Sequence, residues 1–238
     1  IGELERFVAD LSNELILERP KIEKREGKIA IIGSGPAGIS VAGDLAKMGF
    51  EVTIFEGQKE PGGVLIYGIP EFRLPNEVVR REIAKLTRLG VEIKTEVMIG
   101  EDFTAEDLLA QGYDAIFIGT GTALSQVLDL PGKELDGIVT ATYFLGNVAL
   151  AAAGHLHSRE IPVQKGENVI VIGAGNVAMD AARTALREGA ENVTVIYRRT
   201  VNEITALRSE YEHAVEEGVQ FAWLVEPKAY LGEGAVTG

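Results

Sequence analysis

The sequence predicts an α/β protein whose core is two consecutive βαβ units. Its 238 residues are 46% hydrophobic and 25% charged, a globular composition long enough for one large or two small domains. Residues 28–38 and 168–178 share one pattern, an apolar strand followed by a glycine-rich turn. A helical pattern, a glycine and another apolar strand follow each copy. Strands that alternate with helices imply parallel, doubly wound sheets with the ligand site at the carboxyl ends of the strands.

An amphipathic helix and a linker are expected before the first unit. In residues 3–17 apolar side chains recur at spacings of three and four, which is typical of a helix with one apolar face. We expect this helix to be a packing element, with docking of a partner subunit as the alternative. Residues 18–27 are charged and include Pro20, which indicates a linker. The first domain is therefore expected to begin near Lys28.

Both units repeat one order of elements. In the first, residues 28–32 are short and β-branched enough for a buried strand, and Pro36 fits the first turn of the following helix. Gly49 is expected to end that helix, and residues 52–55 to form the next strand. The second unit has strands at 168–172 and 193–196, with Gly189 at the end of its helix. Between the units we expect a loop at 61–75, a helix at 76–89 and a strand at 115–118.

Charge and composition exclude several classes of partner and site. The formal charge of −13 would repel nucleic acid and anionic membrane surfaces. The chain has no cysteine, which excludes disulfides, thiolate metal sites and iron–sulfur ligation within it. The apolar stretch 141–154 is too short to span a bilayer, and the N-terminus lacks the basic region of a signal peptide. We expect a cytoplasmic protein whose redox chemistry, if any, depends on a bound cofactor.

The turn of the first unit matches the GxGxxG pattern of dinucleotide-binding sites. Gly33 allows the tight turn, Gly35 lets the backbone approach a pyrophosphate, and Gly38 lets helix and strand pack closely. The N-terminus of the helix offers N–H donors to phosphate, and a carboxylate at the tip of the next strand can bind ribose. The alternative is that the glycines only form a tight turn. The binding residues predicted here are Gly33, Gly35, Pro36, Ala37, Gly38 and Glu56.

The second unit differs from the first at two positions that distinguish dinucleotides. Its third glycine is replaced by Ala178, and its second strand ends in Arg198 and Arg199 where the first unit has Glu56. Guanidinium groups can bind the 2′-phosphate of NADP, which a carboxylate would repel. The alternative is a solvated pair of charges. We predict FAD in the first site and NADPH in the second, the latter bound by Gly173, Gly175, Asn176, Val177, Ala178, Arg198 and Arg199.

Beyond these patterns, almost the whole chain resembles the small (beta) subunit of NADPH-dependent glutamate synthase and related FAD/NAD(P)-dependent oxidoreductases. The matching stretches are residues 2–7, the first fingerprint, 62–75, 119–121, 173–183 and 197–199. The resemblance implies a glutathione-reductase-like fold of two Rossmann-like domains, with hydride transfer from NADPH to FAD. It implies electron transfer onward to a large catalytic subunit or iron–sulfur acceptor. It also implies flavin contacts at Gly63, Leu65, Tyr67, Gly119, Thr120 and Gly121.

Three departures from the family pattern shape the expected domains. The chain lacks the cysteines of the family's N-terminal iron–sulfur region, and it stops before the family's late Gly-Asp return to the flavin. Residues 203–206 replace the Met-Pro-Ala that many relatives have after the arginine pair. We therefore expect residues 1–27 to be a remnant of the iron–sulfur region. Residues 28–150 are expected to form an incomplete FAD-binding domain, and residues 151–238 an incomplete NADPH-binding domain.

The sequence also leaves an alternative function and several polar side chains to interpret. A truncated dinucleotide-binding fragment without activity is the alternative function, whereas a dithiol mechanism is excluded because the chain has no cysteine. We predict no metal ligand, expecting His155 and His157 in a surface turn and His213 on a helix. Asp180 and Arg183 have the i, i+3 spacing of a local ion pair, and the resemblance suggests that they help to place the second helix. No catalytic side chain is assigned, and a homo-oligomer is left open.

Overall fold

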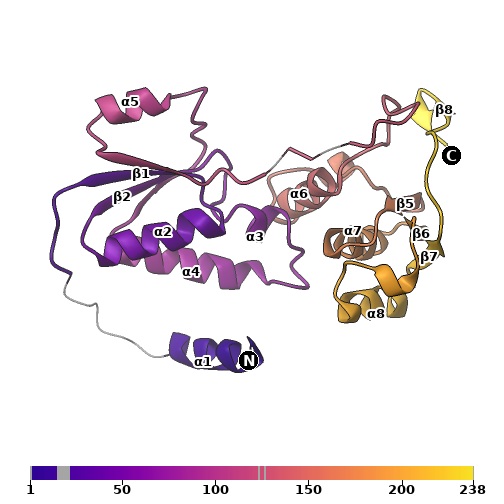
Figure 1. Cartoon of the computed structure of the whole chain (residues 1–238), viewed down its shortest axis with the longest axis horizontal. Coiled ribbons are helices and arrows are strands. Elements are labelled where there is room, and N and C mark those ends of the chain that lie inside the picture. The colour runs from indigo at the N-terminus through magenta and orange to yellow at the C-terminus, as the bar shows by residue number, and fades with distance from the viewer. Residues whose placement is uncertain (1, 15–21, 123, 126, 238) are drawn as a thin grey trace.

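The computed structural model describes residues 2–14, 22–122, 124, 125 and 127–237, which contain two separate parallel sheets. This arrangement confirms the predicted α/β class with two βαβ units. Figure 1 shows two lobes, each a sheet with its own helices. Helices α3 (Val64–Tyr67) and α6 (Ala141–Ala152) pack against each other where the lobes meet.

The first sheet has the strand order β3-β2-β1-β4 with every pair parallel. Its elements are β1 (Lys28–Ile32), α2 (Pro36–Lys47), β2 (Glu51–Phe55), α4 (Asn76–Leu89), β3 (Glu92–Lys94), α5 (Ala105–Ala110) and β4 (Ala115–Ile118). Helices α2 and α4 cover one face and α5 the other (Figure 1). Because side chains alternate along β1, Ile31 packs with α2 and α4, whereas Ile32 packs with Leu108 of α5. A strand buried on both faces explains the continuous apolar run in the sequence.

The predicted ends of the helices are confirmed in the first unit. Pro36 is the first residue of α2, where its missing N–H costs no hydrogen bond. Gly49 follows the last turn with a φ of +98°, a left-handed conformation that favours glycine. Helix α4 spans the predicted residues 76–89 and ends at Gly90, which also has a φ of +98°. The loop expected at 61–75 contains one short helix, α3.

The second sheet has the order β5-β6-β7, again parallel. Its elements are η1 (Ser158–Glu160), β5 (Asn168–Ile172), α7 (Asn176–Arg187), β6 (Asn192–Tyr197), η2 (Val201–Glu203), α8 (Arg208–Glu216) and β7 (Gln220–Trp223). Helix α7 contacts β5, β6, α6 and α8, and residues 178–185 are all buried. Phe144 and Leu145 of α6 belong to the same core. The boundary expected at residue 150 falls inside α6, so we propose that it lies before this helix, near residue 140.

The chain after β7 returns to the segment that links the two units. The hairpin of β8 (Gly232–Glu233) and β9 (Ala235–Val236) lies against residues 131–136 (Figure 1). The N–H of Tyr230 donates to the carbonyl of Pro131 at 2.8 Å, and the N–H of Val236 donates to that of Asp136 at 2.9 Å. These hydrogen bonds attach the end of the described chain to residues 131–136, between the two units.

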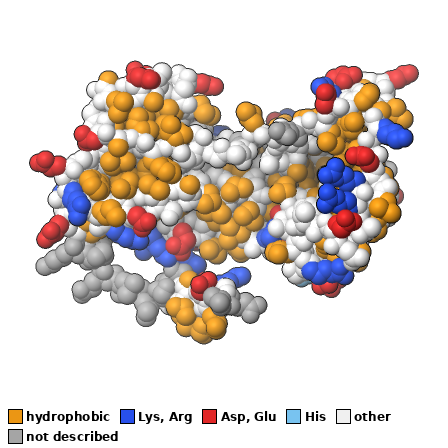
Figure 2. Space-filling model, viewed as in Figure 1, with side chains coloured by type: hydrophobic (Ala, Val, Ile, Leu, Met, Phe, Trp, Pro, Cys, Tyr) orange, Lys and Arg blue, Asp and Glu red, His pale blue; other side chains and the backbone are white. Residues whose placement is uncertain are grey.

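Helix α1 (Gly2–Glu14) differs from the expected packing element. Its polar side faces α4, where Arg81 and Asp10 form an ion pair at 3.8 Å. Its apolar stripe points away from the other elements, with Leu4 70% and Phe7 60% exposed (Figure 2). Residues 15–17, which the helical pattern includes, lie outside the described residues. No helix in the described part of the chain is long and apolar enough to cross a membrane.

Candidate functional site

The first glycine turn lies at the carboxyl end of β1 and is closely packed. Gly33 has a φ of +95°, and its N–H donates to the carbonyl of Phe55 at 2.8 Å. A Cβ on Gly38 would lie only 2.0 Å from the carbonyl oxygen of Gly33, so helix and turn meet backbone to backbone. A Cβ on Gly35 would meet no atom within 4 Å. The turn is therefore closed on its inner side and open at Gly35, as a pyrophosphate cradle requires.

Two distant segments border this turn. A Cβ on Gly33 would lie 2.5 Å from the carbonyl oxygen of Gly119, whose N–H donates to Ile32 at 2.8 Å. Gly63 has a φ of +54°, and a Cβ there would lie 2.8 Å from the Cα of Gly35. Two segments that are far apart in the sequence thus converge on one glycine turn. Thr120 and Gly121 continue from Gly119 at this border, and Gly121 has a φ of +71°.

A buried hydrogen-bond chain fixes the relative positions of these segments. Ser34 is completely buried, and its hydroxyl accepts the N–H of Gly62 at 2.9 Å and donates to Oε2 of Glu56. Glu56 is 7% exposed and also accepts the N–H of Ser34 at 2.9 Å and of Gln58 at 2.8 Å. These donors occupy most of the carboxylate, which was expected to bind ribose. Ser34 was not among the predicted residues, because it occupies a variable position of the GxGxxG pattern.

We expect Ser34→Ala to destabilise the first unit by about 1–3 kcal/mol. The substitution leaves the N–H of Gly62 and one lone pair of Glu56 buried without a partner, and such groups carry the full cost of their lost hydration. The midpoint of urea unfolding, followed by circular dichroism, measures the loss. Ser158→Ala, at an exposed serine, is the matched control. An equal midpoint for both variants would contradict the structural role of Ser34.

The segment at 62–67 places two further candidates of the first unit in an apolar cluster, whereas the predicted Ala37 is exposed on α2. Leu65 and Tyr67 of α3 pack against the buried Ile66, Val79 and Ile83. The hydroxyl of Tyr67 accepts the N–H of Glu60 at 2.8 Å. Burial raises the pKa of Tyr67 above its ordinary value, so the phenol is protonated at neutral pH.

The second glycine turn is bordered by the segment that departs from the family pattern. The carbonyl of Ala174 accepts the N–H groups of Thr205 at 3.2 Å and Ala206 at 3.0 Å. Oδ1 of Asn176 accepts the N–H of Leu207 at 2.9 Å, so this side chain holds the loop in place. The other predicted residues of the turn are Gly173 with a φ of +116°, Gly175, the half-exposed Val177 and the buried Ala178.

The two arginines follow directly after β6, at the same edge of the sheet as the second turn. Arg198 and Arg199 are both exposed, and neither side chain has an ion pair within the described residues. Their backbone is held by the chain after β7, where the N–H of Val225 donates to Tyr197 and that of Leu224 to Arg199. Two guanidinium groups without an ion pair among the described residues are therefore exposed at the end of β6, whose backbone is held by hydrogen bonds.

The predicted local pair of Asp180 and Arg183 is wrong. Nη1 of Arg73, in the first unit, donates to both carboxylate oxygens of Asp180 at 3.0 and 2.8 Å. Arg183 instead binds Glu210 at 3.0 Å and Glu217 at 2.7 Å, both beyond α7 in the chain. Because α7 is buried between the first unit and α8, Asp180 and Arg183 each find a partner on another segment. Such partners are distant in the sequence, so the i, i+3 spacing does not reveal them.

Glu217 provides a test of this network at acid pH. Hydrogen bonds from Arg187, then from Arg183, hold the pKa of Glu217 below its ordinary value of 4.5. Its stabilisation is therefore complete above pH 4.5 and is lost as the pH falls through the lowered pKa. We expect Glu217→Gln to cost about 2 kcal/mol at pH 7 and to converge with the wild type in acid, as measured by urea unfolding at several pH values. A pH-independent difference would contradict this role, and Glu216→Gln, at an exposed neighbour, is the control.

The three histidines form no shared site. Nε2 of His155 lies 3.6 Å from Oε1 of Glu60, His157 precedes η1, and His213 lies on α8. Within the described ranges, no group of three His, Cys, Asp or Glu side chains could hold a metal ion.

The family model described as pyridine nucleotide-disulphide oxidoreductase matches residues 27–237. The chain belongs to this family. It is 38% identical over 245 residues to the glutamate synthase [NADPH] small chain of Escherichia coli, covering 100% of this chain and 52% of that protein. It is 42% identical over 208 residues to the NADP(+)-dependent formate dehydrogenase subunit beta of Moorella thermoacetica, covering 87% of this chain and 28% of that protein. The chain thus spans about half the length of the glutamate synthase relative.

Solved structures of two oxidoreductases share the fold. FprA from Mycobacterium tuberculosis matches with a TM-score of 0.74 at 20% identity, over 89% of this chain and 62% of FprA. The thioredoxin reductase of Lactococcus lactis matches with a TM-score of 0.63 at 24% identity, over 89% of this chain and 69% of that one. These matches confirm the predicted fold, and the similarity to glutamate synthase small chains confirms the resemblance found in the sequence.

Proposed function

We propose that this chain forms the dinucleotide-binding part of an NADPH-dependent FAD oxidoreductase of the glutamate synthase small-chain type. The observation that carries the proposal is the convergence of Gly63 and Gly119 on the open glycine turn at Gly35. A cradle that a Cβ would fill at its borders, yet open at its centre, fits a pyrophosphate. The family match, and the similarity to relatives named for NADPH, support the same assignment.

The two turns would hold different cofactors. We assign FAD to the first glycine turn, because the N-terminus of α2 has no side-chain cap and its N–H groups would be available to a phosphate. The residues that would hold it are Gly33, Gly35, Pro36, Ala37, Gly38, Glu56, Gly63, Leu65, Tyr67, Gly119, Thr120 and Gly121. We assign NADPH to the second turn, with Arg198 and Arg199 on the 2′-phosphate and Gly173, Gly175, Asn176, Val177 and Ala178 along the backbone of the turn.

The protein's own part in the reaction is binding and orientation. When bound, FAD would supply the redox chemistry, accepting two electrons from NADPH and passing them on singly. The packed borders of the first turn would hold one cofactor still, while the arginines select the other by charge. We assign no catalytic side chain. The receiver proposed for the electrons is a large subunit or another iron–sulfur partner, which agrees with relatives named small chains.

An anaerobic absorbance spectrum tests the proposal. The purified chain is mixed with FAD, desalted, and measured before and after NADPH is added. Retained flavin bands that bleach with NADPH, and more slowly with NADH, are the expected result. If no flavin is retained although NADPH binds, the chain alone is a dinucleotide-binding fragment without activity, which is the alternative function.

A further inference from the structure

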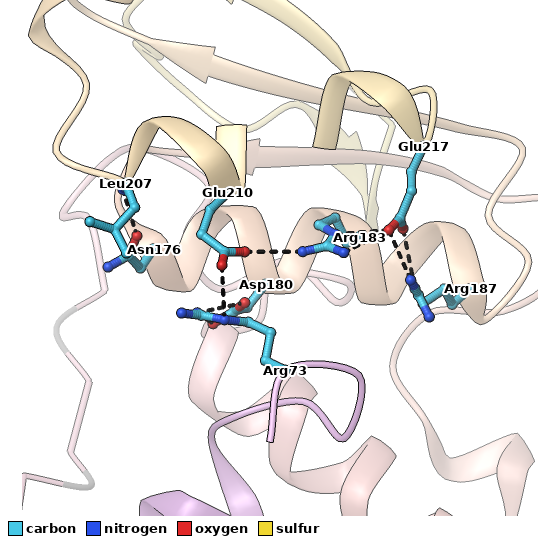
Figure 3. A network of polar contacts seen from close by, with 8 residues as sticks. All are labelled: Arg73, Asn176, Asp180, Arg183, Arg187, Leu207, Glu210 and Glu217. Atoms are coloured by element: carbon cyan, nitrogen blue, oxygen red, sulfur yellow. Dashed lines mark hydrogen bonds and ion pairs between the residues drawn. The ribbon is translucent and has the colours of Figure 1, made fainter. Parts of the chain in front are cut away.

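The loop between α3 and α4 crosses from the first unit onto α7 of the second. Its Phe72 ring lies under two guanidinium groups, with Cζ of Arg183 4.4 Å and Cζ of Arg187 4.1 Å from the ring centroid. The next residue, Arg73, reaches Asp180 and places its Nε 3.4 Å from Oε1 of Glu210 (Figure 3). Two successive side chains of the first unit thus contact the second, Phe72 through cation–π contacts with α7 and Arg73 through ion pairs with α7 and α8.

Arg73 completes a balanced row of charges. Three arginines alternate with three carboxylates in the order Asp180, Arg73, Glu210, Arg183, Glu217 and Arg187 (Figure 3). The side chain of Asp180 is only 4% exposed, so its charge depends on Arg73 for compensation. Burial raises the pKa of Asp180, and Arg73 opposes that shift. Without Arg73, the buried carboxylate would lose its hydrogen-bonded counter-charge and would face Glu210, with the more distant charge of Arg183 as a weaker compensation.

The segment 63–73, which runs from before α3 into this loop, connects the first glycine turn to the helix that follows the second glycine turn. At its start, Gly63 lies against Gly35 of the first turn. At its end, Arg73 holds Asp180, one turn into the helix that begins directly after Gly175 of the second glycine turn. We propose that Phe72 and Arg73 are positioning residues that fix the orientation of the two nucleotide sites relative to each other. The functional part of this inference rests on the proposed function, whereas its geometric part does not.

The geometric part can be measured without a cofactor. Because the chain has no cysteine, Lys47→Cys on α2 and Glu216→Cys on α8 allow two spin labels to be attached selectively. We expect a narrow distribution of label distances in the otherwise native chain and a broad or shifted one after Phe72→Leu with Arg73→Gln. The same narrow distribution in both would overturn the proposal. Arg208→Gln, which removes an arginine paired within α8, is the matched control and should change nothing.

The functional part predicts that the variants change the rate of flavin reduction but not the affinity for NADPH. For the FAD-loaded chain we expect Phe72→Leu and Arg73→Gln each to slow flavin reduction at saturating NADPH, up to about a hundredfold. The affinity for NADPH, read from the emission of Trp223, should stay within about twofold, because the proposed 2′-phosphate site is at Arg198 and Arg199. Phe72→Tyr and Arg73→Lys, which keep the ring and the charge, should recover part of the rate. Reduction at the native rate by the leucine and glutamine variants would refute the positioning role.

The two failures are distinguishable. If the native chain binds no FAD, the proposed function fails, while the label distances still decide whether Phe72 and Arg73 orient the units. If the native chain binds and reduces FAD but the variants do so equally well, the positioning role alone fails. Should Arg73→Gln not fold, Phe72→Leu alone in the spin-labelled chain decides the matter: a broader or shifted distribution of label distances is expected, and the native distribution would overturn the proposal.

Discussion

Gly38→Ala should destabilise the first unit by about 3 kcal/mol and abolish any flavin binding there. The new Cβ would lie 2.0 Å from the carbonyl oxygen of Gly33 and 3.1 Å from its carbonyl carbon. Both are backbone atoms of a turn that is itself fixed by the hydrogen bond from Gly33 to Phe55. Neither side can yield without separating α2 from β1, so the cost reaches the upper range for overpacking.

Gly43→Ala on the same helix is the matched control. Its Cβ would approach only Cδ2 of Leu86, at 3.2 Å, and a side-chain terminus can move. The gain in helix propensity, about 1 kcal/mol, offsets that contact. The measurement is urea unfolding followed both by circular dichroism and by the emission of Trp223, the single tryptophan, which lies in the second sheet. We expect Gly38→Ala to shift only the circular dichroism transition, and a native midpoint would contradict the backbone clash.

Local patterns in the sequence were sufficient for the elements and the two turns. The helix at 76–89 and the strand at 115–118 have the predicted bounds because their apolar periodicity and flanking glycine depend only on near neighbours. The two glycine turns were found because a βαβ unit repeats within the chain. Short elements such as β3, with three residues, carry too few positions for a periodicity to be seen.

Contacts between distant segments were beyond the reach of these patterns. Nothing in the local sequence of Gly119 or Gly63 indicates that their backbones lie against Gly33 and Gly35, and only the family resemblance connected them with a flavin. Arg73 and Asp180 are 107 residues apart, so spacing rules offered Arg183 as the partner instead. Helix α1 shows the same limit, because a periodic pattern identifies an apolar face without showing what that face contacts.

Replacing both Arg198 and Arg199 by alanine should weaken NADPH binding by about 3 kcal/mol, more than a hundredfold, and NADH binding much less. Hydrogen bonds between charged groups are each worth about 1.5–3 kcal/mol, and exposure of both arginines places the pair toward the lower end. Arg198→Ala alone should cost about 1–3 kcal/mol. Titration of Trp223 emission measures both affinities, because this ring lies 6.4 Å from Tyr197, the residue before the pair.

The comparison between the two nucleotides decides what the arginines recognise. Arg159→Ala removes one positive charge at another exposed position, as Arg198→Ala alone does, and corrects for general attraction of anions by the chain. If the arginines bind the 2′-phosphate, the ratio of NADPH to NADH affinity collapses in the double variant and is unchanged in the control. An equal loss for both nucleotides would assign the arginines to the shared pyrophosphate instead. Unchanged affinity for both nucleotides would mean that Arg198 and Arg199 are only solvated charges, as the alternative interpretation of the sequence holds.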